Sequence, residues 1–198
     1  MFVHPLFLAE VAEEIPAANV LSSSPSLYAY FPPDQKAYVN PNLTLDYARL
    51  HLEGRYNYEA QKTGSAWIGY NFKVGKKPSL ELTPMAGAVL GDLTGLALGC
   101  DLSLRYAQVE LSSASEYVFD IAERSGSFFY TWSELSYSPA QWFRAGLVAQ
   151  RTKAYQSDLV IQPGVLAGLA YKDVAFTVYV FNLGWVSPTV VLSLSATF

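Results

Sequence analysis

The stretch Leu96-Ala-Leu-Gly-Cys-Asp-Leu-Ser-Leu-Arg-Tyr106 decides the fold class of this chain. Its large apolar residues occupy every second position, so they share one face of an extended strand. The intervening positions carry Asp101, Ser103 and Arg105 together with alanine and glycine. The stretch is therefore predicted to be a β-strand with one apolar face and one polar face.

The same alternation extends on both sides of this stretch, from Ala48 to the C-terminus. About ten runs of about 10–14 residues show it, which is the pattern of half-buried strands. Turn-forming residues such as Gly75-Lys-Lys-Pro78, Gly91-Asp92 and Lys172-Asp173 separate the runs. The runs are 48–59, 63–75, 79–91, 94–106, 107–120, 126–138, 141–153, 158–172, 173–183 and 188–198.

Composition narrows the class of protein. The 198 residues are 51% hydrophobic and 15% aromatic, but only 15% are charged. This excludes a disordered chain, which is polar and poor in aromatic residues. The net charge of -4 excludes a basic surface for nucleic acid, and the single cysteine excludes an intramolecular disulfide. No run of 18 apolar residues occurs, so no membrane-spanning helix is expected.

The polar faces of the runs indicate which side of a barrel would meet lipid. A soluble barrel of the lipocalin type has an apolar lumen and a charged exterior, whereas a transmembrane barrel reverses this arrangement. The polar faces here are mostly Ser, Thr, Gly, Ala and Asn with paired charges, which suits a lumen better than a soluble exterior. Tight turns also alternate with longer loops, as in bacterial outer-membrane barrels. A soluble, lipocalin-like ligand-binding barrel is the alternative.

Aromatic residues on the apolar faces gather near the strand ends, as expected where strands cross two membrane interfaces. One predicted girdle holds Tyr56, Tyr58, Tyr117, Phe119 and Phe129. The other holds Tyr70, Phe72, Tyr106, Tyr137, Phe143, Tyr171, Phe176 and Phe198. Because an aliphatic band lies between the two girdles, each strand is expected to cross the hydrocarbon once.

These patterns predict an all-β fold: a closed, antiparallel, up-and-down transmembrane β-barrel of about ten strands, with eight as the alternative count. Residues 42–198 form the barrel in this interpretation. Residues 1–41 hold six of the eleven prolines and show no sustained periodicity. They are therefore predicted to be an irregular, Pro-rich N-terminal segment, either a periplasmic tail or a plug. No signal peptide is visible, because no Lys or Arg precedes the first apolar stretch.

The C-terminal stretch Val190-Val-Leu-Ser-Leu-Ser-Ala-Thr-Phe198 alternates apolar positions and ends in phenylalanine. It resembles the terminal strand signature of the small bacterial outer-membrane β-barrel proteins. The resemblance implies a location in the bacterial outer membrane, contact with outer-membrane lipids, and recognition of Phe198 by the barrel-assembly machinery as an assembly signal. It covers residues 42–198 and points to no specific member of that class and no oligomeric state.

Charged side chains on the polar faces are expected to line the barrel interior. The predicted lumen network is Arg49, His51, Glu53, Arg55, Glu59, Glu81, Asp101, Arg105, Glu110, Glu134 and Arg144. Buried ions must pair or cost several kcal/mol each, so one interpretation is a satisfied network that stiffens the barrel. The other is a narrow path for ions or small solutes. Large side chains predicted to point inward would narrow it, namely Trp67, Phe128, Tyr130, Trp132, Trp142, Tyr179 and Phe181.

These features favour a porin-like barrel with a narrow, polar, charge-paired lumen over an enzyme. A closed barrel with a structural or interaction role in the envelope is the alternative. An outer-membrane hydrolase would need a histidine base beside a nucleophile. Only His51, with Glu53 two residues along, suits that role, and no serine partner is identifiable. No cofactor, metal site or nucleic-acid partner is predicted.

Overall fold

The computed structural model describes residues 20–33, 35–122, 124–154, 158–184 and 187–198. Within this part of the chain, the secondary structure is almost entirely antiparallel β-strand. The strands are β1 (Leu21–Phe31), β2 (Tyr38–Tyr47), β3 (Leu50–Tyr56), β4 (Thr63–Tyr70), β5 (Phe72–Val74), β6 (Ser79–Gly91), β7 (Gly95–Tyr106), β8 (Val109–Asp120), β9 (Phe128–Ala140), β10 (Phe143–Ala154), β11 (Val160–Tyr171), β12 (Val174–Phe181) and β13 (Thr189–Ala196). One short 3₁₀ helix, η1 (Arg124–Gly126), precedes β9. No helix in the described residues is long and apolar enough to cross a bilayer.

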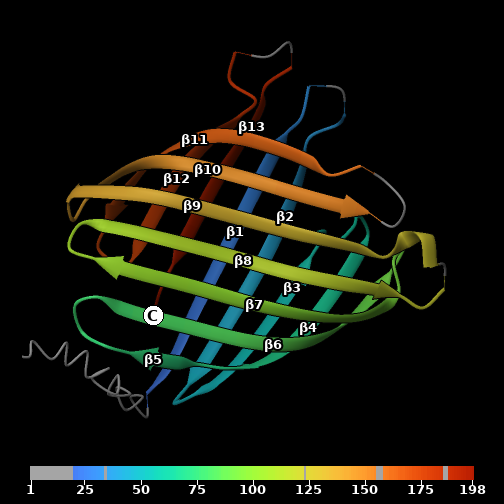
Figure 1. Ribbon diagram of the computed structural model, residues 1–198, viewed down its shortest axis with the longest axis horizontal. Helices are drawn as coiled ribbons and strands as arrows, with labels where there is room; N and C mark the ends of the chain where they lie inside the picture. The colour runs from blue at the N-terminus through green and yellow to red at the C-terminus, as the bar shows by residue number, and fades with distance from the viewer. Residues whose placement is uncertain (1–19, 34, 123, 155–157, 185–186) are drawn as a thin grey trace, which may run out of the picture.

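The strands form one closed antiparallel barrel (Figure 1). Each strand pairs with its neighbours in sequence, and β1 closes the ring by pairing with β13, with Tyr30 opposite Val191. Strands β4 and β5 are two parts of one barrel strand interrupted at Asn71, because both pair with β6. The thirteen strand segments of the described chain therefore make a barrel of twelve strands. Closure gives every barrel edge a partner, as hydrocarbon requires.

The predicted strand count and domain boundary were both wrong, and for the same reason. Strand β1 and the first four residues of β2 lie in the segment that was predicted to be irregular, and the two strands pair with each other over ten residue pairs. The inward positions of β1 are filled by serine and tyrosine, and each of the two strands contains a proline, so the period-two signal is weak. Adding these strands to the predicted ten gives the observed twelve. Residues 1–19 lie outside the described residues, so the tail or plug prediction applies only to them.

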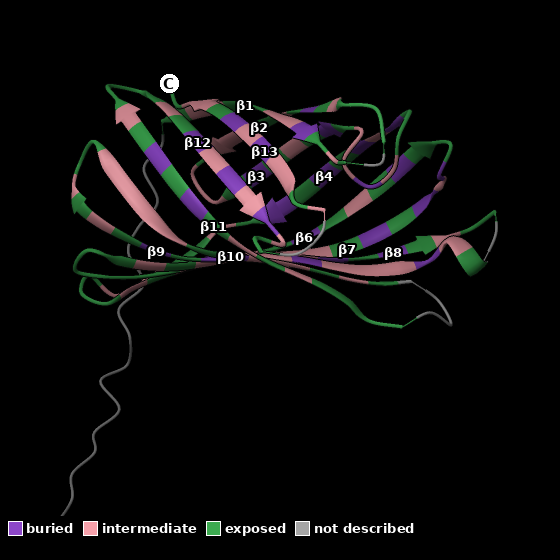
Figure 2. Cartoon of the chain, turned by 90° about the horizontal axis from the view of Figure 1, so that it is seen from above, coloured by how far each residue is buried: buried purple, intermediate pink, exposed green. Residues whose placement is uncertain are grey.

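The outer surface of the barrel is apolar. Along β7, Leu96 and Leu98 are 61% and 58% exposed, so the stripe that decided the fold class faces outward. Along β12, buried positions alternate with exposed or half-buried ones (Figure 2). A lipocalin-like barrel would bury this stripe in its lumen, so the soluble alternative does not describe this protein. The inverted arrangement is that of a transmembrane barrel.

The two rims of the barrel differ in the length of their connections. Two-residue turns join β2 to β3, β7 to β8 and β11 to β12 at the rim that also holds the C-terminus. Their first residues, Ala48, Ala107 and Lys172, have φ values of 51°, 53° and 53°, which suits tight hairpins. Connections at the opposite rim, such as 57–62 and 182–188, are longer. We call these the short-turn rim and the long-loop rim.

Most predicted girdle residues lie on the outer face near a rim. Tyr117 and Phe119 pack together near the long-loop rim, with ring centroids 4.5 Å apart. Tyr70 and Phe72 do the same near the short-turn rim, at 4.7 Å. The outer-face members that are more than one-third exposed are Tyr56, Tyr70, Phe72, Tyr106, Tyr117, Phe119, Tyr137, Tyr171, Phe176 and Phe198. Phe129 and Phe143 are half-buried, and Tyr58 is an exception described below.

The lipid-facing assignment predicts a depth-dependent penalty for charge. Leu98→Arg puts a cation within the outer stripe of β7 and is expected to lower the free energy of unfolding by about 2–4 kcal/mol. Val109→Arg, at the first residue of β8 on the short-turn rim, is expected to cost only about 0–1 kcal/mol. Denaturant titration of the protein refolded into lipid vesicles measures both values. Equal losses for the two variants would contradict the assignment.

Candidate functional site

The barrel interior is filled unevenly along its axis. Toward the long-loop rim, apolar and aromatic side chains from opposite walls form two packed clusters. One cluster comprises Tyr30, Val148, Leu166, Tyr179, Phe181 and Val191, with Tyr28, Tyr38 and Trp132 packed against it. The other comprises Trp67, Met85, Val89, Leu93, Ala97 and Val118, with Ala60 and Phe128. The charged and hydroxyl-bearing side chains lie beside these clusters and between them and the short-turn rim.

Trp132 of β9 packs against the first cluster. Its ring meets Tyr179 and Phe181 of β12 edge-on, with centroids 5.0 and 5.2 Å apart. The indole nitrogen donates a hydrogen bond of 2.8 Å to Glu134. The aromatic cluster therefore narrows the lumen. The indole N–H of Trp132 connects the cluster to the charged side chains through Glu134.

Arg55 of β3 holds the most buried ion cluster. Its Nη1 donates to Glu116 Oε2 at 2.8 Å and its Nη2 donates to Glu53 Oε2 at 2.7 Å. Glu59 Oε1 lies 3.8 Å from Nη1. Because β4, β6 and β7 separate β3 from β8 around the wall, the pairing of Arg55 with Glu116 spans the lumen. We call Arg55, Glu53, Glu59 and Glu116 the Arg55 node.

The connection between β3 and β4 folds inward to complete this node. Asn57 and Lys62 both take positive φ values, 58° and 54°, and the Lys62 amide donates to Asn57 Oδ1 at 2.7 Å. This turn brings Glu59 into the interior, where Ser65 and Trp67 donate to its Oε1 at 2.6 and 3.3 Å. The positive φ of Asn57 ends the alternation of inward and outward side chains along β3. The sequence pattern does not reveal this change of backbone conformation.

Tyr58 is consequently not a girdle residue. The Arg55 guanidinium carbon lies 4.6 Å from the Tyr58 ring centroid, and the ring packs edge-on against Tyr130 at 5.9 Å. The ring of Trp67 lies at the same 4.6 Å distance from the guanidinium. Burial raises the pKa of the Tyr58 hydroxyl well above its ordinary value, so the side chain stays neutral.

A chain of ionic and hydrogen-bonded contacts leads from the Arg55 node toward the short-turn rim. His51 Nδ1 lies 2.9 Å from Asp46 Oδ1, and His51 Nε2 lies 3.7 Å from Glu53 Oε2. Asn71 donates to Asp46 at 2.6 Å and accepts from Thr83 at 2.6 Å. Both ring nitrogens of His51 therefore face carboxylates, which is the arrangement of an interior hydrogen-bonded histidine rather than of a base beside a nucleophile.

Arg144 of β10 holds a second ion cluster. Its Nη1 donates to Glu134 Oε2 at 3.1 Å. Its Nη2 donates to the Thr177 hydroxyl at 3.1 Å and to the Tyr179 hydroxyl at 3.2 Å. These contacts join β9, β10 and β12. Through Tyr179, they also connect the first apolar cluster to the charged side chains of the lumen.

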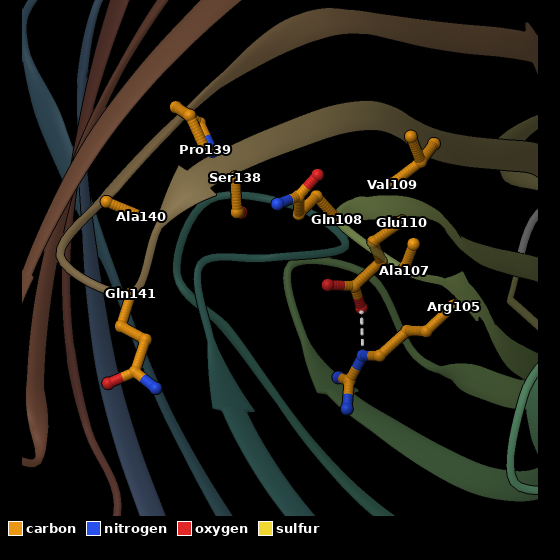
Figure 3. A pocket seen from close by; sticks show the side chains of 9 residues that line it. All are labelled: Arg105, Ala107, Gln108, Val109, Glu110, Ser138, Pro139, Ala140 and Gln141. Carbon is orange, nitrogen blue, oxygen red and sulfur yellow. Dashed lines mark hydrogen bonds and ion pairs between the residues drawn. The ribbon is translucent and has the colours of Figure 1, made fainter.

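The third group of charges lies at the short-turn rim. Arg105 Nε donates to Glu110 Oε1 at 2.9 Å, and Glu81 accepts from Lys73. A pocket of about 390 Å³ opens beside this pair, between the turns at Ala107-Gln108 and 138–141 (Figure 3). Arg105 is 52% exposed, so water screens this group far more than it screens the Arg55 node.

The structure distributes the predicted lumen network over these groups. His51, Glu53, Arg55 and Glu59 meet in and beside the Arg55 node, Glu134 pairs with Arg144, and Glu81, Arg105 and Glu110 lie at the rim. Asp101 is on an inward position of β7, and its Oδ1 is buried without a hydrogen-bond partner. Arg49 lies half-buried in the turn before β3, and its guanidinium carbon is 5.8 Å from the centroid of the Tyr70 ring.

Other interior residues were missed or misplaced. The alternation places Glu116 on a polar face, but it does not show that Glu116 pairs with Arg55 across the lumen. Asp46 and Asn71 were missed because one lies before the first recognised run and the other at the interruption between β4 and β5. Trp142, predicted to point inward, is 62% exposed in the turn before β10 and packs on Phe143.

Carboxylates outnumber cations in the interior of the described barrel. They are Asp46, Glu53, Glu59, Asp101, Glu116 and Glu134, against the guanidinium groups of Arg55 and Arg144 and the imidazole of His51. The lumen is therefore acidic rather than neutral.

Removing Arg55 is expected to be costly because its carboxylate partners would remain buried without a cation. Arg55→Gln should lower the free energy of unfolding by about 3–5 kcal/mol. Arg105→Gln is the matched control, and its half-exposed rim pair should change stability by only about 0–1 kcal/mol. Denaturant titration in vesicles measures both variants. A loss for Arg55→Gln no larger than the control would show that the node does not stabilise the barrel.

Solved structures with a similar fold are bacterial outer-membrane porins. The KdgM porin matches with a TM-score of 0.59 and 13% identity over 88% of this chain and 99% of its own. The KdgM porin in complex with disordered oligogalacturonate matches with the same values. OmpF of Salmonella typhi, in complex with daunomycin, has a TM-score of 0.47 and 7% identity, over 93% of this chain and 100% of its own. No protein-family model and no curated protein sequence matches the chain. By its fold, the chain is a closed antiparallel β-barrel similar to the KdgM porin, with the apolar outer surface of a transmembrane barrel.

Proposed function

We propose that the protein is a porin that conducts ions and small polar solutes through a narrow lumen. The observation that supports this is the series of polar and charged side chains along the interior. It starts at Arg105 and Glu110 on the short-turn rim and passes through Asp46 and His51 to the Arg55 node. A barrel that served only as a scaffold would be more stable with apolar side chains at these positions, because buried ions carry a desolvation penalty.

The acidity of the lumen bears on which solutes pass. The KdgM porin has been solved with oligogalacturonate, an oligosaccharide whose sugars carry carboxylates. The interior of this chain has more carboxylates than cations and would repel such a polyanion. We infer that neutral or cationic solutes, rather than acidic oligosaccharides, use this lumen.

A closed envelope barrel is the second candidate function. Its support is the aromatic cluster around Trp132 together with the Arg55–Glu116 contact, since both obstruct the lumen. In this case the outer surface and loops would carry the role, through contacts with other envelope components. Conductance of the purified full-length protein in a planar bilayer separates the two candidates. Steps above background support the porin, and their absence supports the closed barrel.

Assembly and lipid contact are further parts of the proposal. The outer stripe would contact outer-membrane lipids directly. Phe198 leaves its side chain 72% exposed at the short-turn rim, while its backbone exchanges two hydrogen bonds with Ser23. A C-terminal side chain in this position is accessible to the barrel-assembly machinery before the barrel closes on β1.

The aromatic cluster should limit conductance if the lumen conducts. Phe181→Ala removes a fully buried ring beside Trp132 and is expected to increase single-channel conductance several-fold, because the bore widens beside the aromatic cluster. Phe176→Ala, on the outer face of the same strand, is the matched control and should leave conductance unchanged. Equal conductance in Phe181→Ala and the parent protein would show that the permeation path avoids this cluster.

A further inference from the structure

We propose that the Arg55 node is a cation-binding constriction, and that small inorganic cations are the solutes this lumen selects. This inference rests on the proposed porin function and names its substrate class. It follows from the charge balance of the node, from its unpartnered atoms, and from the way Arg55 is enclosed.

The charge balance of the node is negative. Glu53, Glu59 and Glu116 each place an oxygen within 4.0 Å of the Arg55 guanidinium, and the His51 imidazole lies 3.7 Å from Glu53. The four side chains are 10% exposed or less, so water screens them weakly. One guanidinium, even together with a protonated His51 imidazole, cannot neutralise three carboxylates, and the remaining negative charge attracts a further cation.

The unpartnered atoms near the node are mainly acceptors. Buried oxygens without a hydrogen-bond partner include Glu59 Oε2, Glu116 Oε1 and Asp101 Oδ1. The amide oxygens of Asn40 and Asn42 on β2 are also unpartnered, and Asn42 lies directly opposite Arg55 in the strand register. Buried acceptors without donors are costly, so this part of the lumen lacks positive charge or hydrogen-bond donors. A cation with its water supplies both.

The geometry suits a cation that passes rather than one that stays. In the described chain, no three or more His, Cys, Asp or Glu side chains are placed to hold a metal ion by themselves. An ion at the node would therefore keep part of its water shell and be held by dispersed oxygens. Binding that attracts an ion but lets it leave is what conduction requires.

Arg55 offers little to an anion. Glu116 and Glu53 occupy its two terminal nitrogens, and the rings of Tyr58 and Trp67 lie against the guanidinium at 4.6 Å. Only Nε lacks a hydrogen-bond partner, and it is buried. The node therefore presents carboxylate oxygens to the lumen while its one cation is covered, so chloride should be disfavoured.

The test is ion selectivity of the full chain in planar bilayers across a KCl gradient. The reversal potential of the parent protein is expected to favour K⁺ over Cl⁻ by about threefold or more. Glu116→Gln keeps the side-chain shape and should bring this ratio close to one. Glu110→Gln, which changes the same charge at the exposed rim, is the matched control and should keep most of the preference. Conductance without cation preference, or equal effects of the two variants, would overturn the inference but not the porin.

A second measurement does not depend on conductance. The Trp67 indole donates to Glu59 and its ring lies against Arg55, so its fluorescence should respond when a cation enters the node. Titration of the detergent-solubilised protein with KCl, against choline chloride at equal ionic strength, should give a saturable change that Trp67→Phe and Glu116→Gln abolish. A response without conductance would support the cation site and exclude the porin. No response to KCl would overturn the cation site, whatever the conductance.

Discussion

Everything in this structure depends on the need to pair backbone N–H and C=O groups inside hydrocarbon. An open sheet would leave one row of these groups unpaired at each edge, at a cost of several kcal/mol for each group. The pairing of β1 with β13 removes both edges, and the hydrogen bonds between Ser23 and Phe198 extend it to the end of the chain. The chain can therefore place leucine, valine and aromatic side chains over its whole outer surface.

An outer surface with little charge leaves most ions to the interior. Side chains that alternate with the lipid-facing positions have only the lumen to enter, and there they must find partners in a confined space. The Arg144 cluster achieves this with carboxylate and hydroxyl groups. The Arg55 node does so incompletely, because three carboxylates share one guanidinium. The same constraint that makes the barrel stable thus leaves negative charge in the lumen for a mobile ion to balance.

Sequence periodicity succeeded where strands are regular and failed where they begin or turn. It identified the runs from β3 onward and the outward stripe of β7, because lipid selects a strong contrast between the two faces. It missed β1 and β2, whose inward positions carry serine, tyrosine and asparagine and whose sequences include proline. It misplaced Tyr58 and Trp142, which both lie in turns where the backbone leaves the extended conformation.

The sequence by itself determined the class of fold, the lipid-facing surface and the charged character of the lumen, because each depends only on which residues alternate along a strand. The tertiary structure alone decided the closure of twelve strands, the contact of Arg55 with Glu116, and the inward fold of Glu59. Arg55 and Glu116 are 61 residues apart, and their distance follows from the curvature of the wall. Alternation states which side of the wall a residue occupies, and the closed barrel decides which residues face each other across it.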